Sequence, residues 1–80
     1  MHIDLYTAPG CRACTEAKKF LASHGIQFEE RNVLSDPEFM RILTDELDSR
    51  TTPTLVMGDK IIVGFDPVEY QLLTVRPGSD

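Results

Sequence analysis

The feature that most constrains this chain is a change of hydrophobic period soon after its start. Residues 2–6 alternate apolar and polar side chains, as a β-strand with one buried face does. From Cys11 onwards the apolar residues follow helical spacing instead, and Gly25 stands where a helix commonly ends. The residues of this helical stripe are Cys14, Ala17 and Leu21. A strand that passes directly into a helix predicts the opening of a β-α-β unit, with a turn at residues 7–10.

The next segment supplies a second strand and a second helix. Residues 27–33 are predicted to form the strand, because an imperfect alternation there lies between two helical patterns. The tetrapeptide SDPE at residues 35–38 is a typical helix start, in which Ser35 or Asp36 caps the first turn. The expected buried stripe of this helix comprises Phe39, Met40, Leu43 and Leu47.

Two short apolar runs later in the chain predict a β-hairpin. Residues 54–57 and 60–63 flank Gly58-Asp59, a two-residue loop of the kind that joins antiparallel strands. Asp66 then repeats the helix-start pattern. The expected apolar stripe of this last helix comprises Val68, Leu72, Leu73 and Val75.

The order of elements is therefore β-α-β-α-β-β-α, which predicts an α/β sandwich built on one mixed four-stranded sheet. A right-handed crossover would join the first two strands in parallel. A chain of 80 residues buries only about 60% of its unfolded surface, so we expect residues 1–80 to form a single domain with one core.

Composition argues against several classes of function. The net charge is −5 and Lys18-Lys19 is the one adjacent basic pair, so no nucleic-acid partner is expected. These lysines and Glu29-Glu30 are interpreted as solvated charges. No apolar run approaches the roughly 20 residues of a membrane span, and the first residues lack the pattern of a secretory signal. We therefore expect a cytoplasmic protein with no membrane partner.

The two cysteines, Cys11 and Cys14, are separated by two residues. Such a pair can be a structural disulfide, half of a zinc site or a redox-active pair. A structural disulfide is the weakest of these, because it would close too short a loop to constrain the unfolded chain. Zinc needs two further ligands, and His2 and His24 are predicted on a strand and at the far end of a helix. Redox chemistry is favoured, and neither a metal nor another cofactor is expected.

Cys11 lies at the predicted start of a helix, where unpaired N–H groups and the helix dipole favour an anion. Such surroundings lower the pKa of a cysteine thiol, and the neighbouring Arg12 acts in the same direction. Cys14 lies one helical turn further on and can reach the first sulfur. This spacing permits attack by Cys11 on a substrate disulfide, followed by release when Cys14 attacks Cys11.

Pro53 directly precedes a strand expected inside the sheet, where a missing N–H is costly. A cis bond after Thr52 would explain this position. The backbone of Thr52 would then face Cys11 and pair with an incoming peptide as an added strand. A trans proline that begins an edge strand is the alternative, and trans is the commoner form of X-Pro bonds.

Three separated motifs, LYTxxxCxxC, a later Thr-Pro pair and GDKIIVGFD, together resemble the glutaredoxin family, in particular the redoxins that serve ribonucleotide reductase. The resemblance implies a thioredoxin-like fold with Cys11 as nucleophile, Cys14 as resolving cysteine and Pro53 in the cis form. Arg12, between the cysteines, is a further expected substrate contact. The resemblance implies a substrate groove lined by Thr52, Pro53, Gly64, Phe65 and Asp66.

The activity implied by this resemblance is that of a dithiol-disulfide oxidoreductase. We expect it to act as a monomer on protein disulfides, and ribonucleotide reductase is a candidate substrate. Arg12-Ala13 departs from the Pro and aromatic residue usual in the family, which leaves the redox potential open. Ala8 and Pro67 replace the lysine and the acidic residue of members that use glutathione. This difference favours thioredoxin reductase over glutathione as electron donor, and it makes Asp66 more simply a helix cap.

The stretch from LYTAPGCRAC through FEERNVLSDP also resembles the arsenate-reductase-like family, which includes a regulator that binds RNA polymerase and senses redox state through its cysteine pair. That resemblance implies a redox-sensing binding module without turnover. Members of that family carry extra helices for which 80 residues leave no room, and the GFDP segment fits the glutaredoxin pattern. The regulator is kept as the alternative.

Overall fold

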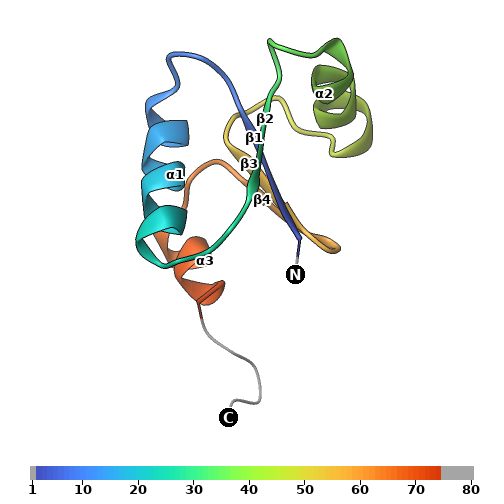
Figure 1. Cartoon of the computed structure of the whole chain (residues 1–80). Coiled ribbons are helices and arrows are strands. Elements are labelled where there is room, and N and C mark those ends of the chain that lie inside the picture. The colour runs from blue at the N-terminus through green and yellow to red at the C-terminus, as the bar shows by residue number, and fades with distance from the viewer. Residues whose placement is uncertain (1, 75–80) are drawn as a thin grey trace.

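Strands and helices alternate in the computed structural model, which describes residues 2–74 (Figure 1). A short π-helical turn, η1, directly continues the second helix. The elements are β1 (Ile3–Thr7), α1 (Arg12–Ser23), β2 (Glu29–Asn32), α2 (Pro37–Arg41), η1 (Ile42–Glu46), β3 (Thr54–Met57), β4 (Lys60–Val63) and α3 (Pro67–Leu72). This order confirms the predicted succession of strands and helices.

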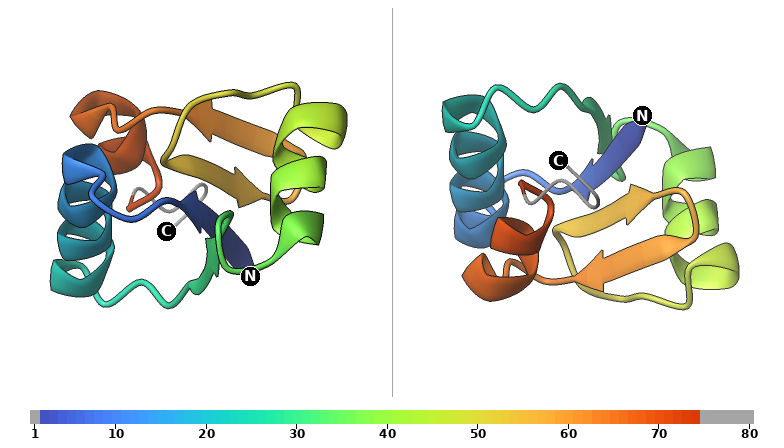
Figure 2. Two further views of the ribbon diagram at one scale, coloured as in Figure 1. Left: turned by 90° about the horizontal axis from the view of Figure 1, so that it is seen from above. Right: turned by 90° about the horizontal axis from the view of Figure 1, so that it is seen from below.

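The four strands form one mixed sheet in the order β2-β1-β3-β4. β1 pairs with β2 in parallel, Asp4 standing opposite Glu29, and it pairs with β3 in the antiparallel sense. β3 and β4 form the predicted antiparallel hairpin. The helices α1 and α3 cover one face of the sheet and α2 covers the other (Figure 2). The predicted α/β sandwich is therefore confirmed.

Each face of the sheet has its own apolar cluster, because successive side chains of a strand point to opposite faces. Leu5 and its neighbour Tyr6 are both buried for this reason. The cluster under α1 and α3 comprises Ile3, Leu5, Ala17, Leu21, Leu55, Ile62 and Tyr70, and the cluster under α2 comprises Tyr6, Val33 and Leu43. The larger cluster fixes α1, whose first residues carry the cysteines.

β2 is shorter than predicted, because it is an edge strand with β1 as its one neighbour. It covers Glu29–Asn32, and its residues pair with Asp4–Thr7 of β1. The pairing ends where β1 ends, after a last backbone bond from Val33 N to Thr7 O at 2.9 Å. The predicted strand over residues 27–33 was therefore too long at both ends.

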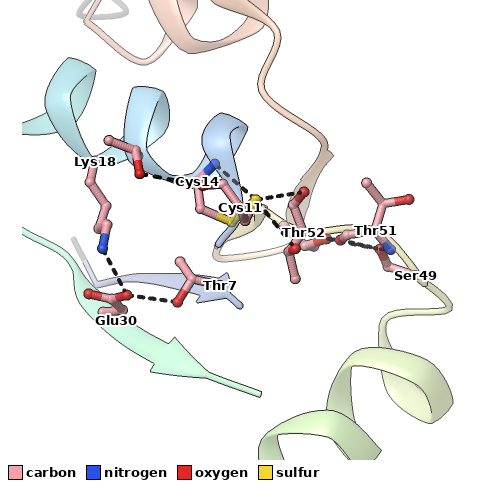
Figure 3. Close-up of a disulfide and its surroundings, with 10 residues drawn as sticks. Thr7, Cys11, Cys14, Lys18, Glu30, Ser49, Thr51 and Thr52 are labelled. Carbon is pink, nitrogen blue, oxygen red and sulfur yellow. Dashed lines mark hydrogen bonds and ion pairs between the residues drawn. A yellow bond between two sulfur atoms is a disulfide. The ribbon is translucent and has the colours of Figure 1, made fainter. Parts of the chain in front are cut away.

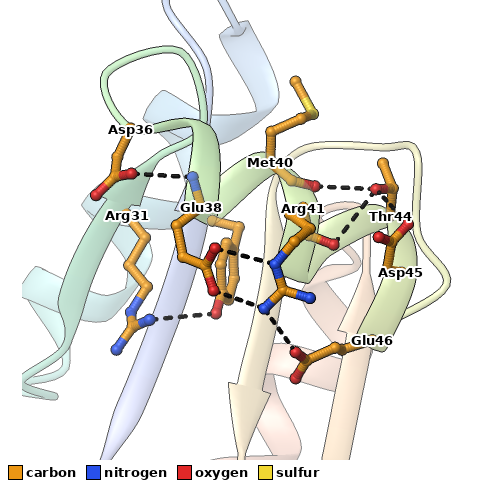
Figure 4. Close-up of polar contacts among 9 residues, drawn as sticks. Arg31, Asp36, Glu38, Met40, Arg41, Thr44, Asp45 and Glu46 are labelled. Carbon is orange, nitrogen blue, oxygen red and sulfur yellow. Dashed lines mark hydrogen bonds and ion pairs between the residues drawn. The ribbon is translucent and has the colours of Figure 1, made fainter.

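The second helix begins as predicted, with the Asp36 side chain accepting a hydrogen bond from Glu38 N at 2.9 Å. It then widens, since Leu47 N donates to Ile42 O five residues earlier, the pattern of a π-helix. Arg41 pairs with both Glu38 and Glu46, the latter at 2.9 Å (Figure 4). The predicted stripe holds for Leu43, while Met40 is 37% exposed and was wrongly included.

The last helix is capped as predicted but faces the core differently. Asp66 accepts a hydrogen bond from Val68 N at 3.0 Å. The predicted stripe was wrong for Val68 and Leu72, which are 70% and 54% exposed, whereas Leu73 packs against the core as predicted. Tyr70 is buried instead and packs on Phe65, with ring centroids 4.8 Å apart. The large aromatic ring fills more of the core than the smaller aliphatic side chains would, and so sets the helix face. Val75 lies outside the described residues.

Candidate active site

Cys11 is the N-cap residue of α1, and its position follows from the turn that joins β1 to this helix. Its backbone is still extended, with φ −91° and ψ 108°, so its side chain turns back over the first helical turn. Cys14 N donates a hydrogen bond to Cys11 Sγ at 3.1 Å. The two cysteines are joined by a disulfide, with Cα atoms 5.2 Å apart (Figure 3). A backbone donor therefore points at the first sulfur from the helix end.

The two sulfurs differ in their surroundings. Cys14 is 2% exposed and belongs to the inner face of α1, which also carries Ala17 and Leu21. Cys11 is partly exposed at the surface. A partner molecule can reach Cys11, whereas Cys14 is shielded by the core. Such an arrangement allows one sulfur to react with a substrate and the other to react only with its neighbour.

The loop before β3 reaches Cys11 from the opposite side of the site. The Thr52-Pro53 peptide bond is cis, as the resemblance to the glutaredoxin family implies. Thr52 O and Thr52 Oγ1 each lie 3.6 Å from Cys11 Sγ (Figure 3). The hydroxyl can donate a hydrogen bond to a thiolate at Cys11, while a thiol there can donate to the carbonyl.

A buried hydroxyl pair, which no sequence pattern predicts, holds this loop in place. Ser49 and Thr54 are 3% and 0% exposed, and their hydroxyl oxygens lie 2.9 Å apart. Both hydroxyl oxygens also lie within hydrogen-bond distance of Thr51 O, at 3.2 Å and 2.6 Å respectively, so one hydroxyl can donate to this carbonyl while the other donates to its partner hydroxyl. Burying a hydroxyl is favourable only when it is hydrogen-bonded, so this pair fixes the path of the chain into Thr52. The polar run DSRTT at residues 48–52 has the composition of an ordinary exposed loop, so nothing in it indicates that Ser49 is buried.

A second feature missed from the sequence is a surface depression of about 340 Å³ beside the disulfide. Thr7 Oγ1 donates to Glu30 Oε2 at 2.7 Å, and Lys18 Nζ lies 3.1 Å from the same oxygen. The hydrogen bond from Thr7, with a smaller effect of Lys18, lowers the pKa of Glu30. Lys18 and Glu30 were interpreted as solvated charges, but they form one wall of this site. The lining residues are Ala8, Pro9, Gly10, Cys11, Arg12, Cys14, Thr15, Lys18, Glu30 and Asn32.

The remaining predicted site residues fall into two groups. Arg12 is exposed and lines the depression beside the disulfide, and Gly64 is held to the cis-proline by a hydrogen bond from Gly64 N to Pro53 O at 2.8 Å. Phe65 is partly buried against Tyr70 and Phe20, which supports a role as an anchor in the core. The Asp66 carboxylate is engaged in capping α3.

The two histidines lie away from the cysteines. His24 stacks on Phe20 at the end of α1, with ring centroids 4.1 Å apart. His2 lies beside Asp4 and Glu29, where three possible ligand atoms fall within 4.8 Å of one another. Arg31 Nε also lies 3.2 Å from Asp4, so a cation already occupies this cluster. Among residues 2–74, neither histidine is placed to complete a zinc site with the cysteines.

A cysteine pair at the start of the first helix, facing a cis-proline loop in a four-stranded sandwich, places the chain in the class of thioredoxin-like folds. The comparisons with known proteins specify the class further. The chain belongs to the glutaredoxin family, since the family model described as Glutaredoxin matches residues 3–62.

Among its relatives is a glutaredoxin-like protein NrdH of Lactococcus lactis subsp. lactis (strain IL1403). It is 33% identical over 71 residues, which cover 89% of this chain and 97% of the relative. The solved structure of NrdH-redoxin from Escherichia coli, a glutaredoxin-like protein described as having a thioredoxin-like activity profile, superimposes with a TM-score of 0.87 at 31% identity. The superposition covers 96% of this chain and 100% of the Escherichia coli chain.

A second group of relatives consists of transcriptional regulators. The global transcriptional regulator Spx 1 of Oceanobacillus iheyensis is 30% identical over 87 residues. The match covers 95% of this chain, so the likeness extends well beyond residues 5–37, the stretch on which the resemblance was based. This chain spans 66% of the length of that regulator. Within residues 2–74, no helix combines the length and apolar character that a membrane span requires.

Proposed function

We propose that this protein is a small dithiol-disulfide oxidoreductase that passes electrons from a reductase to protein disulfides through Cys11 and Cys14. The observation that carries the proposal is the pair of donors at the accessible sulfur. Cys14 N points at Cys11 Sγ from the helix end, and Thr52 Oγ1 lies on the other side. Both stabilise a thiolate, which is the form of cysteine that attacks a disulfide.

The proposed reaction begins from the reduced protein. The Cys11 thiolate attacks one sulfur of the substrate disulfide, forming a mixed disulfide and releasing the other substrate sulfur as a thiolate, which takes up a proton. Cys14 then loses its proton and attacks Cys11, which releases the second substrate thiol. Two electrons and two protons have passed to the substrate, and the protein is left with its Cys11–Cys14 disulfide.

Substrate binding is proposed to use the residues around the exposed sulfur. The Thr52 backbone lies beside Cys11 and precedes β3, so an extended peptide could pair with it as an added strand. Arg12 lines the depression beside the disulfide, Pro53 directly follows Thr52, and Gly64 N is hydrogen-bonded to Pro53 O. Phe65 and Asp66 directly follow Gly64 in the sequence, so we propose that they lie at the border of the substrate groove.

For the electron donor we propose a flavin-dependent thioredoxin reductase rather than glutathione. The positions of Ala8 and Pro67 support this choice, because both lack the charge expected in members that use the tripeptide. The likeness to NrdH-redoxin of Escherichia coli, with its thioredoxin-like activity profile, supports it as well. Ribonucleotide reductase is the candidate substrate that the sequence resemblance suggests. We further propose that the protein acts in the cytoplasm as a monomer, that residues 1–80 form its single domain, and that it needs no cofactor.

The alternative is a redox-sensing binding module that does not turn over. The likeness to the Spx regulators over 95% of this chain supports it. A sensor would switch its affinity for a partner when the Cys11–Cys14 disulfide forms, without reducing other disulfides. The two proposals therefore differ in whether the protein catalyses reduction under steady-state conditions.

The test is an assay of insulin disulfide reduction with NADPH and thioredoxin reductase, run in parallel with glutathione, glutathione reductase and NADPH. We expect multiple turnovers with thioredoxin reductase. Turnover with glutathione alone would contradict the proposed donor. Stoichiometric oxidation without turnover in both assays would favour the sensor.

A further inference from the structure

The positive charges of the described chain are distributed unevenly around the disulfide. Of the lysines and arginines within residues 2–74, most form ion pairs, namely Lys18 with Glu30, Arg31 with Asp4, Arg41 with Glu38 and Lys60 with Glu69. Arg12, Lys19 and Arg50 are exposed and have no ion pair among the described residues.

Two of these three cations belong to the chain segments that meet at the accessible sulfur. Arg12 directly follows Cys11, and Arg50 stands two residues before Thr52, whose carbonyl oxygen lies 3.6 Å from Cys11 Sγ. Arg12 and Arg50 therefore come from two different segments of the chain, the start of α1 and the loop before β3. Lys19 is also exposed but does not line the depression.

The depression beside the disulfide adds a third cation on the same side as Arg12. Its walls carry Arg12, Lys18 and one carboxylate, that of Glu30. Thr7 and Lys18 both contact Glu30 Oε2, which leaves less of its charge to repel an anion. The first turn of α1 contains no acidic residue. The lining of the depression therefore carries two positive charges and one negative charge, although the whole chain has a net charge of −5.

We propose that this cationic surface, formed by Arg12, Arg50 and the adjoining depression, selects protein substrates whose disulfide lies in an acidic segment. The inference rests on the proposed oxidoreductase function and specifies its substrate class. Carboxylates next to the substrate cysteine would come close to Arg12 and Arg50 as Cys11 attacks. Exposed ion pairs of this kind are weak, so each should change the rate by about threefold, and the effect appears as a rate preference rather than as an absolute requirement.

The test uses three synthetic peptides of equal length that each contain one intramolecular disulfide. The residues flanking their cysteines are aspartate in the first, asparagine in the second and lysine in the third. The reduced full-length protein is mixed with each peptide, and the second-order rate constant of reduction is measured. An ionic strength of about 0.1 M is suitable, because the Debye length is then about 10 Å and the distant negative charges of the chain are screened.

We expect the aspartate peptide to react fastest and the lysine peptide slowest. Arg12→Gln and Arg50→Gln should each lower the ratio of the aspartate rate to the asparagine rate by about threefold. The ratio is the informative quantity, because any effect of Arg12 on the pKa of Cys11 acts equally on both peptides. Lys19→Gln is the matched control: it removes the same charge from an exposed position on α1, and we expect the ratio to stay unchanged.

The outcomes separate this inference from the function on which it rests. Failure to reduce any peptide would overturn the proposed function. Equal rates with the aspartate and asparagine peptides would overturn the cationic surface alone, and so would an equal loss of the ratio in Lys19→Gln. Glutathione disulfide is a further substrate in the same assay. If it reacts as fast as the aspartate peptide and loses as much rate in Arg12→Gln, the surface recognises the carboxylates of the tripeptide, and the proposed protein segment is wrong.

Discussion

The surroundings of Cys11 and of Cys14 differ although the two residues belong to one helical turn. Cys11 faces an open, polar region formed by Thr52, Arg12 and the depression. Cys14 is buried in the apolar face of α1, together with Leu21. One helix end can therefore supply both a reactive sulfur and a protected one. Substitutions on the open side should change the chemistry of Cys11, and substitutions on the enclosed side should change the stability of the fold.

The largest expected effect separates the roles of the two sulfurs. Cys11→Ser should abolish disulfide reduction, because the accessible nucleophile is lost. Cys14→Ser should still attack the substrate but should accumulate a mixed disulfide, since no second sulfur is present to release it. Non-reducing gel electrophoresis with a disulfide-bearing protein substrate measures the trapped species. Trapping to the same extent by both variants would contradict the assignment of roles.

The enclosed side is tested by Leu21→Ala. Leu21 is 0% exposed, and removing a buried leucine side chain in this way costs about 2–5 kcal/mol of the free energy of unfolding. Urea denaturation measures this loss. Leu72→Ala is the matched control, because Leu72 is 54% exposed and its truncation should change stability by no more than about 0.5 kcal/mol. Similar losses in the two variants would show that the face assigned to α1 or to α3 is wrong.

The open side is tested by Thr52→Val, which removes the hydroxyl 3.6 Å from Cys11 Sγ. A thiolate that loses one donor is less stable, so the pKa of the Cys11 thiol should rise and the rate of alkylation at neutral pH should fall about threefold. Iodoacetamide alkylation of the reduced protein measures the rate. Thr51→Val is the control, since the same change is made one residue away, at an exposed side chain. Equal rates for wild type and Thr52→Val would remove Thr52 Oγ1 from the account.

The smallest effect concerns Glu30 in the wall of the depression. The fold lowers the pKa of Glu30, mainly through the hydrogen bond from Thr7, so the folded state binds this proton less readily than the unfolded state. The resulting stability is present above the unfolded pKa, about 4.3, and is lost as the pH falls through the folded pKa. We expect Glu30 to contribute less than about 1 kcal/mol to the free energy of unfolding, because the carboxylate is partly exposed.

The measurement is denaturation of wild type and Glu30→Gln from pH 7 to pH 3. The difference in free energy of unfolding between them at pH 7 should disappear in acid. A difference that persists unchanged at pH 3 would contradict this origin.

Much of the fold could be predicted because it depends on short-range patterns. The change of period at Cys11, the caps at Asp36 and Asp66 and the Gly58-Asp59 turn are each written in a few adjacent residues. The wrong predictions concern helix faces, because tertiary packing determines which face of a helix is buried. Tyr70 sets the inner face of α3 through contacts with Phe20 and Phe65, and no local pattern contains those contacts.

The site shows the same division. Cys11, Cys14 and the Thr52-Pro53 bond carry a local signal, and the structure brings them together. The buried pair Ser49 and Thr54 and the contact of Lys18 with Glu30 depend on segments that meet only in three dimensions. Polar residues in a loop or on a helix give the same sequence pattern whether they are solvated or buried.

The central claim is that the surroundings of Cys11 stabilise its thiolate, and the most direct measurement is the pKa of that thiol. Ultraviolet absorbance of the thiolate, followed during pH titration of the reduced Cys14→Ser variant, reports this ionisation for Cys11 alone. The account predicts a pKa clearly below about 8.5, the value of a free cysteine. A pKa at or above that value would contradict it, because neither Cys14 N nor Thr52 Oγ1 would then be stabilising the charge.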